Sequence, residues 1–476
     1  MTSTMLSDEQ IGRVHEASLR ILGEIGVEVP HADMLSRFAE AGARVDFERR
    51  VVRIPADCVE NCLRTAGKQF SIFGRDESKT ARFGQGTRNF NSIAGEASWI
   101  EELGGPRRYA RLADVAVAAR LGDALPNINI VGAMTDPHDV PAEVACVEVL
   151  AELVRHTTKP VTLWYHDRAS AKYLNEIQVA LRGSEEAVFD RPYTYPFLEP
   201  ISPLRFPFNG IDLLYETAKL NLPVPIGPMA QTGLSAPSTL AGTMAHENAE
   251  ILAGVCVTQL IREGMPVCYG GICHAFDMRT TQLIFSGPEQ AIFGVAMTQM
   301  GKHYGLPVYI NVGLTDSKRV DAQAGLEAGI SLALGAAAGA DIFGHMGISG
   351  VDQASSADML VFQDEVIGFV ESTMRDMDFS DEAFGFETSV NVGPGGSFIA
   401  EEHTARNFRK EVWQPTVLDR EYYQAWRDSG ASSTEERVVA KRKELLATHE
   451  VEPVSEELEK ALRGITAGAR RELCGG

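Results

Sequence analysis

The stretch MPVCYGGI (265–272) is a continuous apolar run that opens on a Met-Pro pair and ends after two glycines. A run without polar alternation is typical of a parallel strand buried on both faces. Helical stretches separate it from seven similar runs: NFNSIAG (89–95), NINIVGAM (127–134), KPVTLWYH (159–166), RPYTYPFLEP (191–200), LPVPIGPM (222–229), LPVYINVG (306–313) and ADIFGHMG (340–347). Eight strand–helix units predict an α/β protein with a (β/α)8 TIM barrel. A doubly wound open sheet is the alternative, disfavoured because no GxGxxG motif follows the first run.

Two further parts flank these eight units. Residues 1–85 hold helical patterns, the first beginning after Ser7 as a candidate N-cap, and short strand-like pieces, so they predict an N-terminal helical and small-sheet subdomain. The barrel is expected over 86–403, including a glycine-rich GPGG segment (393–396) that we expect to close over the strand ends. Residues 404–476 predict a C-terminal helical extension, packed on the barrel or on a second copy of the chain. We therefore expect a homo-oligomer.

Composition excludes several classes of protein. The 476 residues carry a formal charge of −21, which argues against a protein that grips nucleic acid or an anionic membrane. We find no apolar run near the roughly 18 residues that span a bilayer. The N-terminal MTSTMLSDEQ has neither the basic nor the apolar region of a signal peptide. We expect a cytoplasmic protein that contacts no nucleic acid and no membrane.

In barrels of this type, the chemistry lies at the carboxyl ends of the strands. Aromatic residues gather there: Trp164, Tyr165, Tyr195 and Phe197. Aromatic faces attract cations, and several converging rings form the kind of cage that holds a methylated ammonium. The alternative is that each ring fills a layer of the core.

Polar residues at the strand ends offer fewer options. His345 follows the last strand and precedes a Gly-rich loop, so it could donate to a carboxylate or act as a base. Asp316, after the seventh strand, is a second candidate, although a loop carboxylate or a helix N-cap has the same pattern.

Patterns of metal ligands are weak. Cys268, Cys273 and His274 could bind Zn²⁺, but Cys273 and His274 are neighbours in an extended segment and would point to opposite sides. Cys58 and Cys62 are spaced i, i+4 on an expected helix, without a nearby His. We predict no metal site, and the seven cysteines do not form a disulfide pattern.

Five separated stretches resemble the trimethylamine methyltransferase family, in the same order along the chain. They are EPISPLRF (199–206), GPMAQTGLSAPSTLAG (227–242), GGICHAFDMRTT (270–281), GLTDSKRVDAQAGLEA (313–328) and VGPGGSFIAEEHT (392–404). The resemblance covers nearly the whole chain. It implies a barrel enzyme that moves a methyl group from an amine to cobalt in a separate corrinoid protein. This chain is then expected to bind no cofactor itself, because the partner supplies the cobalamin.

The founding branch of that family uses pyrrolysine, which no position of this sequence holds. Gly313 stands at the strand end where we expect its equivalent. The chain is similar instead to the non-pyrrolysine branch, whose members act on quaternary amines such as glycine betaine. A quaternary ammonium leaves as a neutral tertiary amine, so the protein needs only to position it. The mouth of the barrel is then where the corrinoid protein docks.

These arguments predict the site residues. We expect His345, Asp316 and Gly313 to be catalytic. We expect the following residues to bind substrate: Asn91, Trp164, Tyr165, Tyr195, Phe197, Glu199, Gln231, Asn311 and His345. A substrate carboxylate would be oriented by neutral donors, because Arg205 is the one arginine in a loop after a strand end.

Alternatives remain at this stage. The substrate could be proline betaine, carnitine or choline rather than glycine betaine. The barrel could bind a methylated amine without turning it over. A metal-assisted hydrolase or lyase is a third possibility, which would need zinc held by Cys268, Cys273 or His274.

Overall fold

The computed structural model describes residues 1–475. Its centre is a sheet with parallel neighbours in the order β11–β13–β16–β17–β6. These strands are β11 (Val224–Ile226), β13 (Val267–Gly271), β16 (Val308–Asn311), β17 (Ile342–Met346) and β6 (Asn89–Ser92). A second parallel pair joins β9 (Val131–Gly132) to β10 (Val161–Thr162). Every residue of these strands is buried, which confirms the prediction of an α/β protein with buried parallel strands.

The predicted strand RPYTYPFLEP forms no regular strand. It runs beside β11 through a bridge between Leu198 and Ile226, and the Tyr193 carbonyl accepts a hydrogen bond from the Val161 N–H. Three of its residues are prolines, at 192, 196 and 200. A proline has no N–H to donate, so this segment cannot form a continuous ladder of hydrogen bonds.

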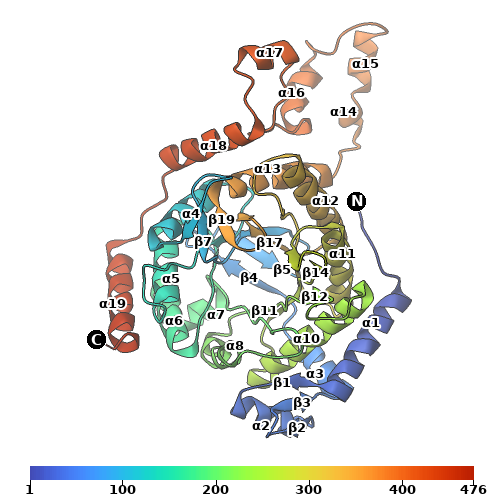
Figure 1. The fold of residues 1–476 in the computed structure, drawn as a ribbon. Coiled ribbons are helices and arrows are strands. Elements are labelled where there is room, and N and C mark those ends of the chain that lie inside the picture. Colours follow the sequence, from blue (N-terminus) through green and yellow to red (C-terminus); the bar gives the residue numbers. More distant parts are fainter. Residues whose placement is uncertain (476) are drawn as a thin grey trace.

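Helices surround the strands (Figure 1). The long ones are α4 (Leu112–Ala124), α5 (Ala145–His156), α6 (Arg168–Arg182), α10 (Leu240–Ile261), α11 (Pro288–His303), α12 (Ala322–Ala338) and α13 (Ala357–Met374). Short helices α7 (Glu185–Asp190), α8 (Phe208–Asp212) and α9 (Leu214–Thr217) lie between α6 and β11 in the sequence. Within residues 1–475, no helix is long and apolar enough to cross a membrane.

The N-terminal part is packed against α10. It comprises α1 (Asp8–Arg20), β1 (Val27–Glu28), α2 (Ala32–Glu40), β2 (Arg44–Asp46), β3 (Val51–Arg53) and α3 (Ala56–Thr65). Ser7 caps α1 as predicted, in a capping box with Gln10. Helices α1, α2 and α3 all contact α10, so this subdomain adds a layer to that side of the molecule.

A hairpin of β4 (Phe70–Phe73) and β5 (Thr80–Phe83) enters the core itself. Its buried side chains pack with Tyr195, Tyr309 and Ile342 of the central segments. The Gly84 N–H donates to the Asp341 carboxylate just before β17, at 2.7 Å. The hairpin therefore covers the amino-terminal ends of the strands and leaves the opposite ends for a site.

Two small sheets lie beyond the carboxyl ends of the central strands. One has the order β12 (Gln231–Thr232), β14 (His274–Asp277), β15 (Gln282–Ile284). The other has the order β18 (Ile348–Ser349), β19 (Ala354–Ser356), β7 (Ser98–Ile100), β8 (Arg107–Tyr109). They hold the loops after β11, β13, β17 and β6 in place around the strand ends.

Two C-terminal helices lie on the body. Helix α18 (Thr434–Thr448) packs on α13 and α4, and α19 (Glu456–Leu473) packs on α5 and α6. Ion pairs fasten both: Arg442 to the buried Asp358 at 2.6 Å, and Arg155 to Glu459 at 2.8 Å.

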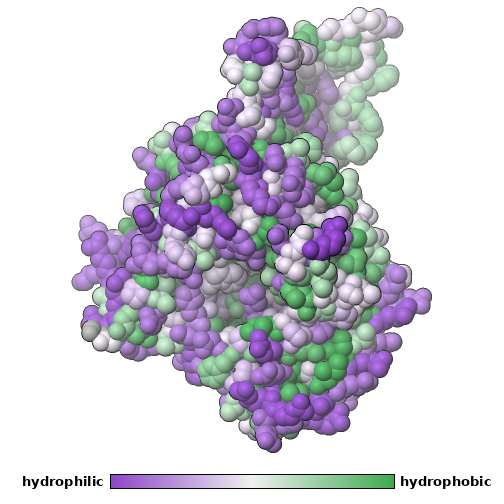
Figure 2. All heavy atoms as spheres, viewed as in Figure 1, coloured by the Kyte–Doolittle hydropathy of each residue, from purple (hydrophilic) through white to green (hydrophobic). Residues whose placement is uncertain are grey.

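Residues 375–431 form an arm that projects from the body, except that 413–418 return to α13, where Val417 is buried and its N–H donates to Glu365 (Figure 1). The arm contains α14 (Asp381–Phe384), α15 (Phe386–Val392), α16 (Glu402–Glu411) and α17 (Tyr423–Asp428), none of which has a buried residue. Hydrophobic residues show on the surface of its α14–α15 side (Figure 2). The GPGG segment (393–396) follows α15 and so lies in the arm. The segment is not among the residues that line the spaces at the strand ends, so its closure over them stays a prediction.

The hairpin in the core generates a stability prediction. Phe83 is fully buried and stacks on Phe70 with ring centroids 4.3 Å apart. Replacing Phe83 with Ala should lower the free energy of unfolding by about 3–5 kcal/mol, because a cavity is left in a packed core. Phe47→Ala, at a side chain that is 58% exposed, is the control. Denaturant unfolding would measure both, and equal losses would contradict a buried hairpin.

Candidate functional site

A cavity of about 240 Å³ lies at the carboxyl ends of the central strands. It brings together Trp164, Phe197, Glu199, Asn311 and His345, five residues that the sequence placed at strand ends. The other lining residues are Ile93, Gly95, Glu96, Met229, Ile272 and Asp352. The lining contains no Lys or Arg among the residues that the structure describes.

Two aromatic rings form one part of the wall. Trp164 and Phe197 meet edge to face, with centroids 6.0 Å apart, and the Trp164 Nε1–H donates to the Gly95 carbonyl at 2.9 Å. Neighbouring glycines leave room for both rings. A Cβ on Gly227 would lie 2.7 Å from Phe197 Cζ, and a Cβ on Gly95 would lie 3.1 Å from Trp164 Cδ1. The rings are thus held in fixed positions beside the cavity.

Three carboxyl groups share the same cavity. Burial, helped by the charge of Asp352, raises the pKa of Glu199 to about 7. The same two causes, in the same order, raise the pKa of Glu96 to about 8. Burial also raises the pKa of Asp352. Glu96 and Glu199 are therefore only partly ionised near neutral pH and would release protons to balance a cation.

The loop after β17 delivers Asp352 to the cavity. Val351 and Asp352 have φ angles of 64° and 54°, in the left-handed region that non-glycine residues rarely adopt. Two successive residues in this conformation are costly, and such strain is common where a side chain must be aimed at a site.

His345 is a neutral member of the lining. Burial, with a smaller effect of His274, lowers its pKa to about 3. Its ring lies 6.2 Å from Trp164 and 5.5 Å from Tyr309, measured between centroids. A neutral imidazole can donate or accept a hydrogen bond but adds no positive charge. The neighbouring Asn311 Oδ1 is buried with no partner among the described residues.

An outer hollow of about 760 Å³ continues from the cavity. The two share Trp164, Phe197, Glu199 and Met229. Tyr165 and Gln231 line only the outer hollow, together with His166, Asn209 and Ser235. The sequence-predicted residues therefore fall into an inner group beside the carboxyls and an outer group that is neutral and polar.

Four predicted residues do not line either space. Tyr195 is buried in the cluster around the hairpin, and Asn91 is buried in β6. The Gly313 N–H donates to Ser331 Oγ at 3.0 Å, and its carbonyl accepts from Gln363. The Asp316 carboxylate accepts from the Phe285 N–H at 3.0 Å. Here Gly313 and Asp316 make contacts that hold loops together.

Glu247 of α10 stabilises the wall from behind. Its fully buried carboxylate accepts the N–H groups of Ala230, Ile272 and Cys273 at 3.0, 2.7 and 2.8 Å. Burial raises its pKa well above the ordinary value. One side chain thus connects the segments after β11 and β13, which carry Met229 and Ile272 of the lining.

Sequence reasoning missed Glu96 and Asp352. Glu96 comes four residues after β6, and Asp352 lies in the Gly-rich loop after His345. Both lie within loops that follow strand ends, so the rule that chemistry gathers there could have found them. The suspected zinc ligands Cys268, Cys273 and His274 do not form a metal-ligand group within residues 1–475.

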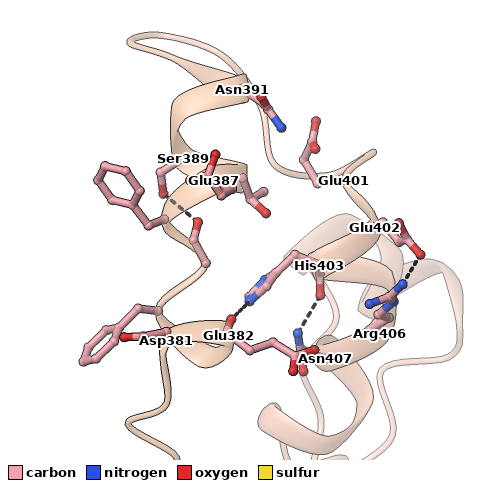
Figure 3. A pocket seen from close by; sticks show the side chains of 14 residues that line it. Asp381, Glu382, Glu387, Ser389, Asn391, Glu401, Glu402, His403, Arg406 and Asn407 are labelled. Carbon is pink, nitrogen blue, oxygen red and sulfur yellow. Dashed lines mark hydrogen bonds and ion pairs between the residues drawn. The ribbon is translucent and has the colours of Figure 1, made fainter.

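A larger groove of about 990 Å³ lies in the arm, between α14–α15 and α16 (Figure 3). His403 contacts the Glu382 carbonyl across it at 3.1 Å, and Arg406 pairs with Glu402 on its edge. Acidic side chains face it from both sides, including Asp381, Glu387 and Glu401. It is separate from the strand ends and holds none of the predicted site residues.

Comparisons with known proteins agree with the resemblance seen in the motifs. A family model described as trimethylamine methyltransferase matches residues 1–474. A glycine betaine methyltransferase of Desulfitobacterium hafniense (strain Y51) is 30% identical over 98% of both chains. A trimethylamine methyltransferase of Methanosarcina thermophila is 28% identical over 96% of both chains.

The crystal structure of the monomethylamine methyltransferase of Methanosarcina barkeri matches with a TM-score of 0.49 and 11% identity, covering 98% of this chain and 95% of that chain. The family model alone covers almost every residue, in agreement with the five motifs. This chain therefore belongs to the trimethylamine methyltransferase family.

Proposed function

We propose that this chain transfers a methyl group from a quaternary ammonium to the Co(I) of a corrinoid carried by a separate protein. The observation that carries the proposal is the inner cavity, where the faces of Trp164 and Phe197 meet the carboxyls of Glu96, Glu199 and Asp352. Aromatic faces and carboxylates both attract a cation. The named activity of the relatives supplies the methyl transfer.

The residues of this chain bind and orient the ammonium. The corrinoid would supply the nucleophile when its protein docks, and it would have to reach the methyl carbon from the side opposite to nitrogen. The C–N bond breaks with its electron pair on nitrogen, so a neutral tertiary amine leaves and no proton donor is needed. Trp164 and Phe197 hold the methyl groups, and holding them in line with the nucleophile is the main contribution of the protein.

Glycine betaine is the first substrate to test, because it is named for the relative from Desulfitobacterium hafniense. Its carboxylate would have to point away from the three carboxyls of the inner cavity. The outer hollow offers neutral polar groups for it on Asn209, Gln231 and Ser235. Choline, carnitine and proline betaine share the ammonium and differ at that outer end.

We propose further that the central segments close into a (β/α)8 barrel. An isolated β-bridge between Asn91 and Ile130 joins β6 to the residue just before β9. The Val161 N–H of β10 donates to the Tyr193 carbonyl, which joins β10 to the following segment. The bridge between Leu198 and Ile226 then reaches β11. These contacts support closure of the sheet, and the surrounding helices in Figure 1 fit it better than two flat layers.

The homo-oligomer is proposed to form through the arm. Large apolar side chains are exposed there: Phe379, Phe384, Phe386, Phe398 and Ile399. A contiguous apolar surface of this kind marks a contact with another protein, and the arm has no buried residue of its own in α14–α17. A second copy of this chain is the partner that we assign to it.

Anaerobic methyl transfer tests the function. The full chain is mixed with Co(I)-cobalamin and one amine at a time, and the cobalamin spectrum reports methylation. Transfer is expected with glycine betaine or another quaternary amine, and none with trimethylamine.

Trp164→Leu should weaken substrate binding about tenfold, since a cation–π contact contributes about 1–2 kcal/mol. Trp164→Phe keeps an aromatic face and should lose less. Calorimetric binding without any transfer would contradict catalysis and favour a binding protein.

The raised carboxyl pKa values generate a pH prediction. As the pH rises through about 7 and then about 8, Glu199 and Glu96 lose their protons and the cavity gains negative charge. The affinity for choline, a permanent cation without a group that titrates in this range, should therefore rise several-fold. Glu199→Gln should abolish the increase in choline affinity near pH 7. Glu96→Gln should abolish the increase near pH 8.

Calorimetry across this pH range measures the effect. The exposed Glu143→Gln variant should keep the full profile. The fold responds in the opposite direction: because folding raises the pKa of both carboxyls, the free energy of unfolding falls as the pH rises through these values. Bound choline should offset that loss. A pH-independent affinity would argue against carboxylates in the cation site.

The arm prediction concerns assembly. Wild-type protein should elute as a dimer or larger species in size-exclusion chromatography with light scattering. The triple variant Phe384→Ser, Phe386→Ser, Ile399→Ser should be monomeric, because it removes apolar surface from the arm. A control triple variant at exposed apolar sites on the body, Phe47→Ser, Phe208→Ser, Met278→Ser, should leave assembly unchanged. A monomeric wild type would contradict the proposal.

A further inference from the structure

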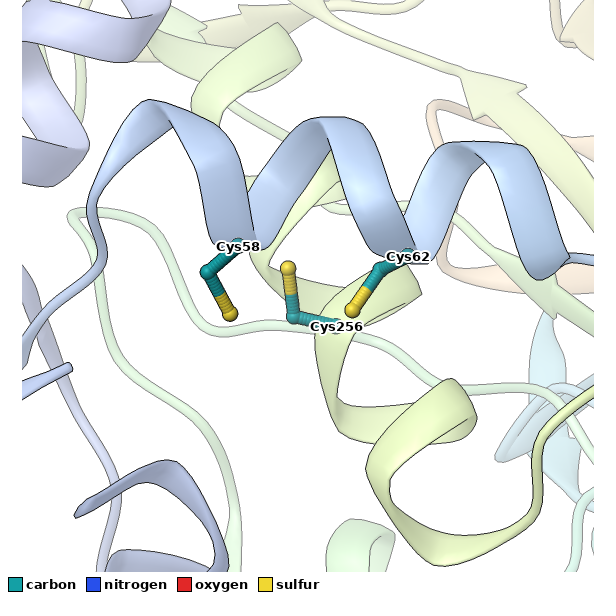
Figure 4. Close-up of side chains that lie close together, drawn as sticks. All are labelled: Cys58, Cys62 and Cys256. Atoms are coloured by element: carbon teal, nitrogen blue, oxygen red, sulfur yellow. The ribbon is translucent and has the colours of Figure 1, made fainter. Parts of the chain in front are cut away.

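Three cysteines meet where α3 packs on α10, away from the cavity at the strand ends (Figure 4). Cys58 and Cys62 lie one turn apart on α3, and Cys256 faces them from α10. Their three Sγ atoms all lie within 4.8 Å of one another. The i, i+4 pair on α3 was visible in the sequence, but the third thiol comes from a helix far along the chain.

The surroundings favour bound metal over three isolated thiols. Cys256 and Cys62 are buried and Cys58 is half-buried, so the cluster lies at the contact between the two helices. Separations of this size between the three Sγ atoms suit one ion bound to all of them, because a Zn–S bond is about 2.3 Å long.

We propose that Cys58, Cys62 and Cys256 bind one thiophilic metal ion, of the class of Zn²⁺ or Cu⁺, that fastens α3 to α10. A set of sulfur ligands selects soft ions. Three thiolates satisfy Cu⁺, whereas Zn²⁺ adds a fourth ligand such as a water. Binding forms three S–metal bonds, releases the thiol protons and changes no oxidation state.

The ion would act on the fold rather than on substrate. Helix α10 also carries Glu247, which accepts the N–H groups of Ala230, Ile272 and Cys273 behind the cavity wall. A cross-link between α3 and α10 limits the movement of that helix. Metal binding to the folded chain alone would raise its stability by mass action.

Metal titration of the full chain tests the proposal. Protein treated with a chelator and reductant under anaerobic conditions is titrated with Co²⁺, whose thiolate complexes absorb through sulfur-to-metal charge transfer. The absorption should saturate at one equivalent and disappear when Zn²⁺ or Cu⁺ is added. Zn²⁺ or Cu⁺ should also raise the unfolding temperature. Cys62→Ser and Cys256→Ser should lose both effects.

Two further variants keep the result interpretable. Cys58→Ser, at the half-buried position, should fold even if a buried substitution does not, and it should weaken the charge-transfer signal. Cys146→Ser, at a buried cysteine outside the cluster, should leave the titration unchanged. A wild-type protein with no charge-transfer absorption would overturn the proposal. The same holds for an absorption that survives all three cluster substitutions, or for loss of two thiols to a disulfide with no metal bound.

Discussion

The ends of parallel strands leave backbone N–H groups without strand partners, and a site can form there only if other groups satisfy them. Glu247 does so for Ala230, Ile272 and Cys273 with one fully buried carboxylate. Desolvation of this group is costly and raises its pKa, and the three N–H donors act against that effect. The segments after β11 and β13 are thereby held together, which gives the cavity its wall at Met229 and Ile272. The same contact joins α10 to the cavity wall, in addition to the apolar packing of this helix.

Much of the fold follows from hydrophobic patterning. Unbroken apolar runs such as VCYGG in 267–271 identified buried parallel strands, because both faces of each strand are covered. The same reasoning failed for RPYTYPFLEP, where composition matched but three prolines removed donors. The β4–β5 hairpin was expected in a lead-in subdomain, yet its side chains fill the core beneath Tyr195 and Tyr309. The alternation of apolar residues in a sequence shows that one face of a hairpin is apolar. It does not show which part of the protein covers that face.

The sequence located the residues that line the cavity to within about two positions along each strand segment, which corresponds to one layer of side chains. Phe197 and Asn311 line the cavity, whereas Tyr195 and Tyr309, two residues earlier in each segment, pack with the hairpin. Two residues of extended chain span about 6.6 Å, which is one layer of the core. An uncertainty of two residues in a strand end therefore moves a residue from the site into the core. The rule about loops after strand ends includes Asp352 among the candidates, but its direction into the cavity depends on a left-handed loop conformation that sequence patterns do not reveal.

In the proposed function, the charge of the cavity would have to satisfy two opposing demands. A quaternary ammonium is held by negative charge, but its positive charge declines on nitrogen as the C–N bond breaks. Three fully ionised carboxylates would therefore stabilise the bound ground state more than the transition state. The raised pKa values of Glu96 and Glu199 leave the cavity partly protonated near neutral pH, so its attraction for the cation is moderate. The neutral His345 adds no repulsion. In this proposal, Trp164 and Phe197 would provide most of the orientation, because their attraction for a cation is modest and their shape stays constant as the charge disperses.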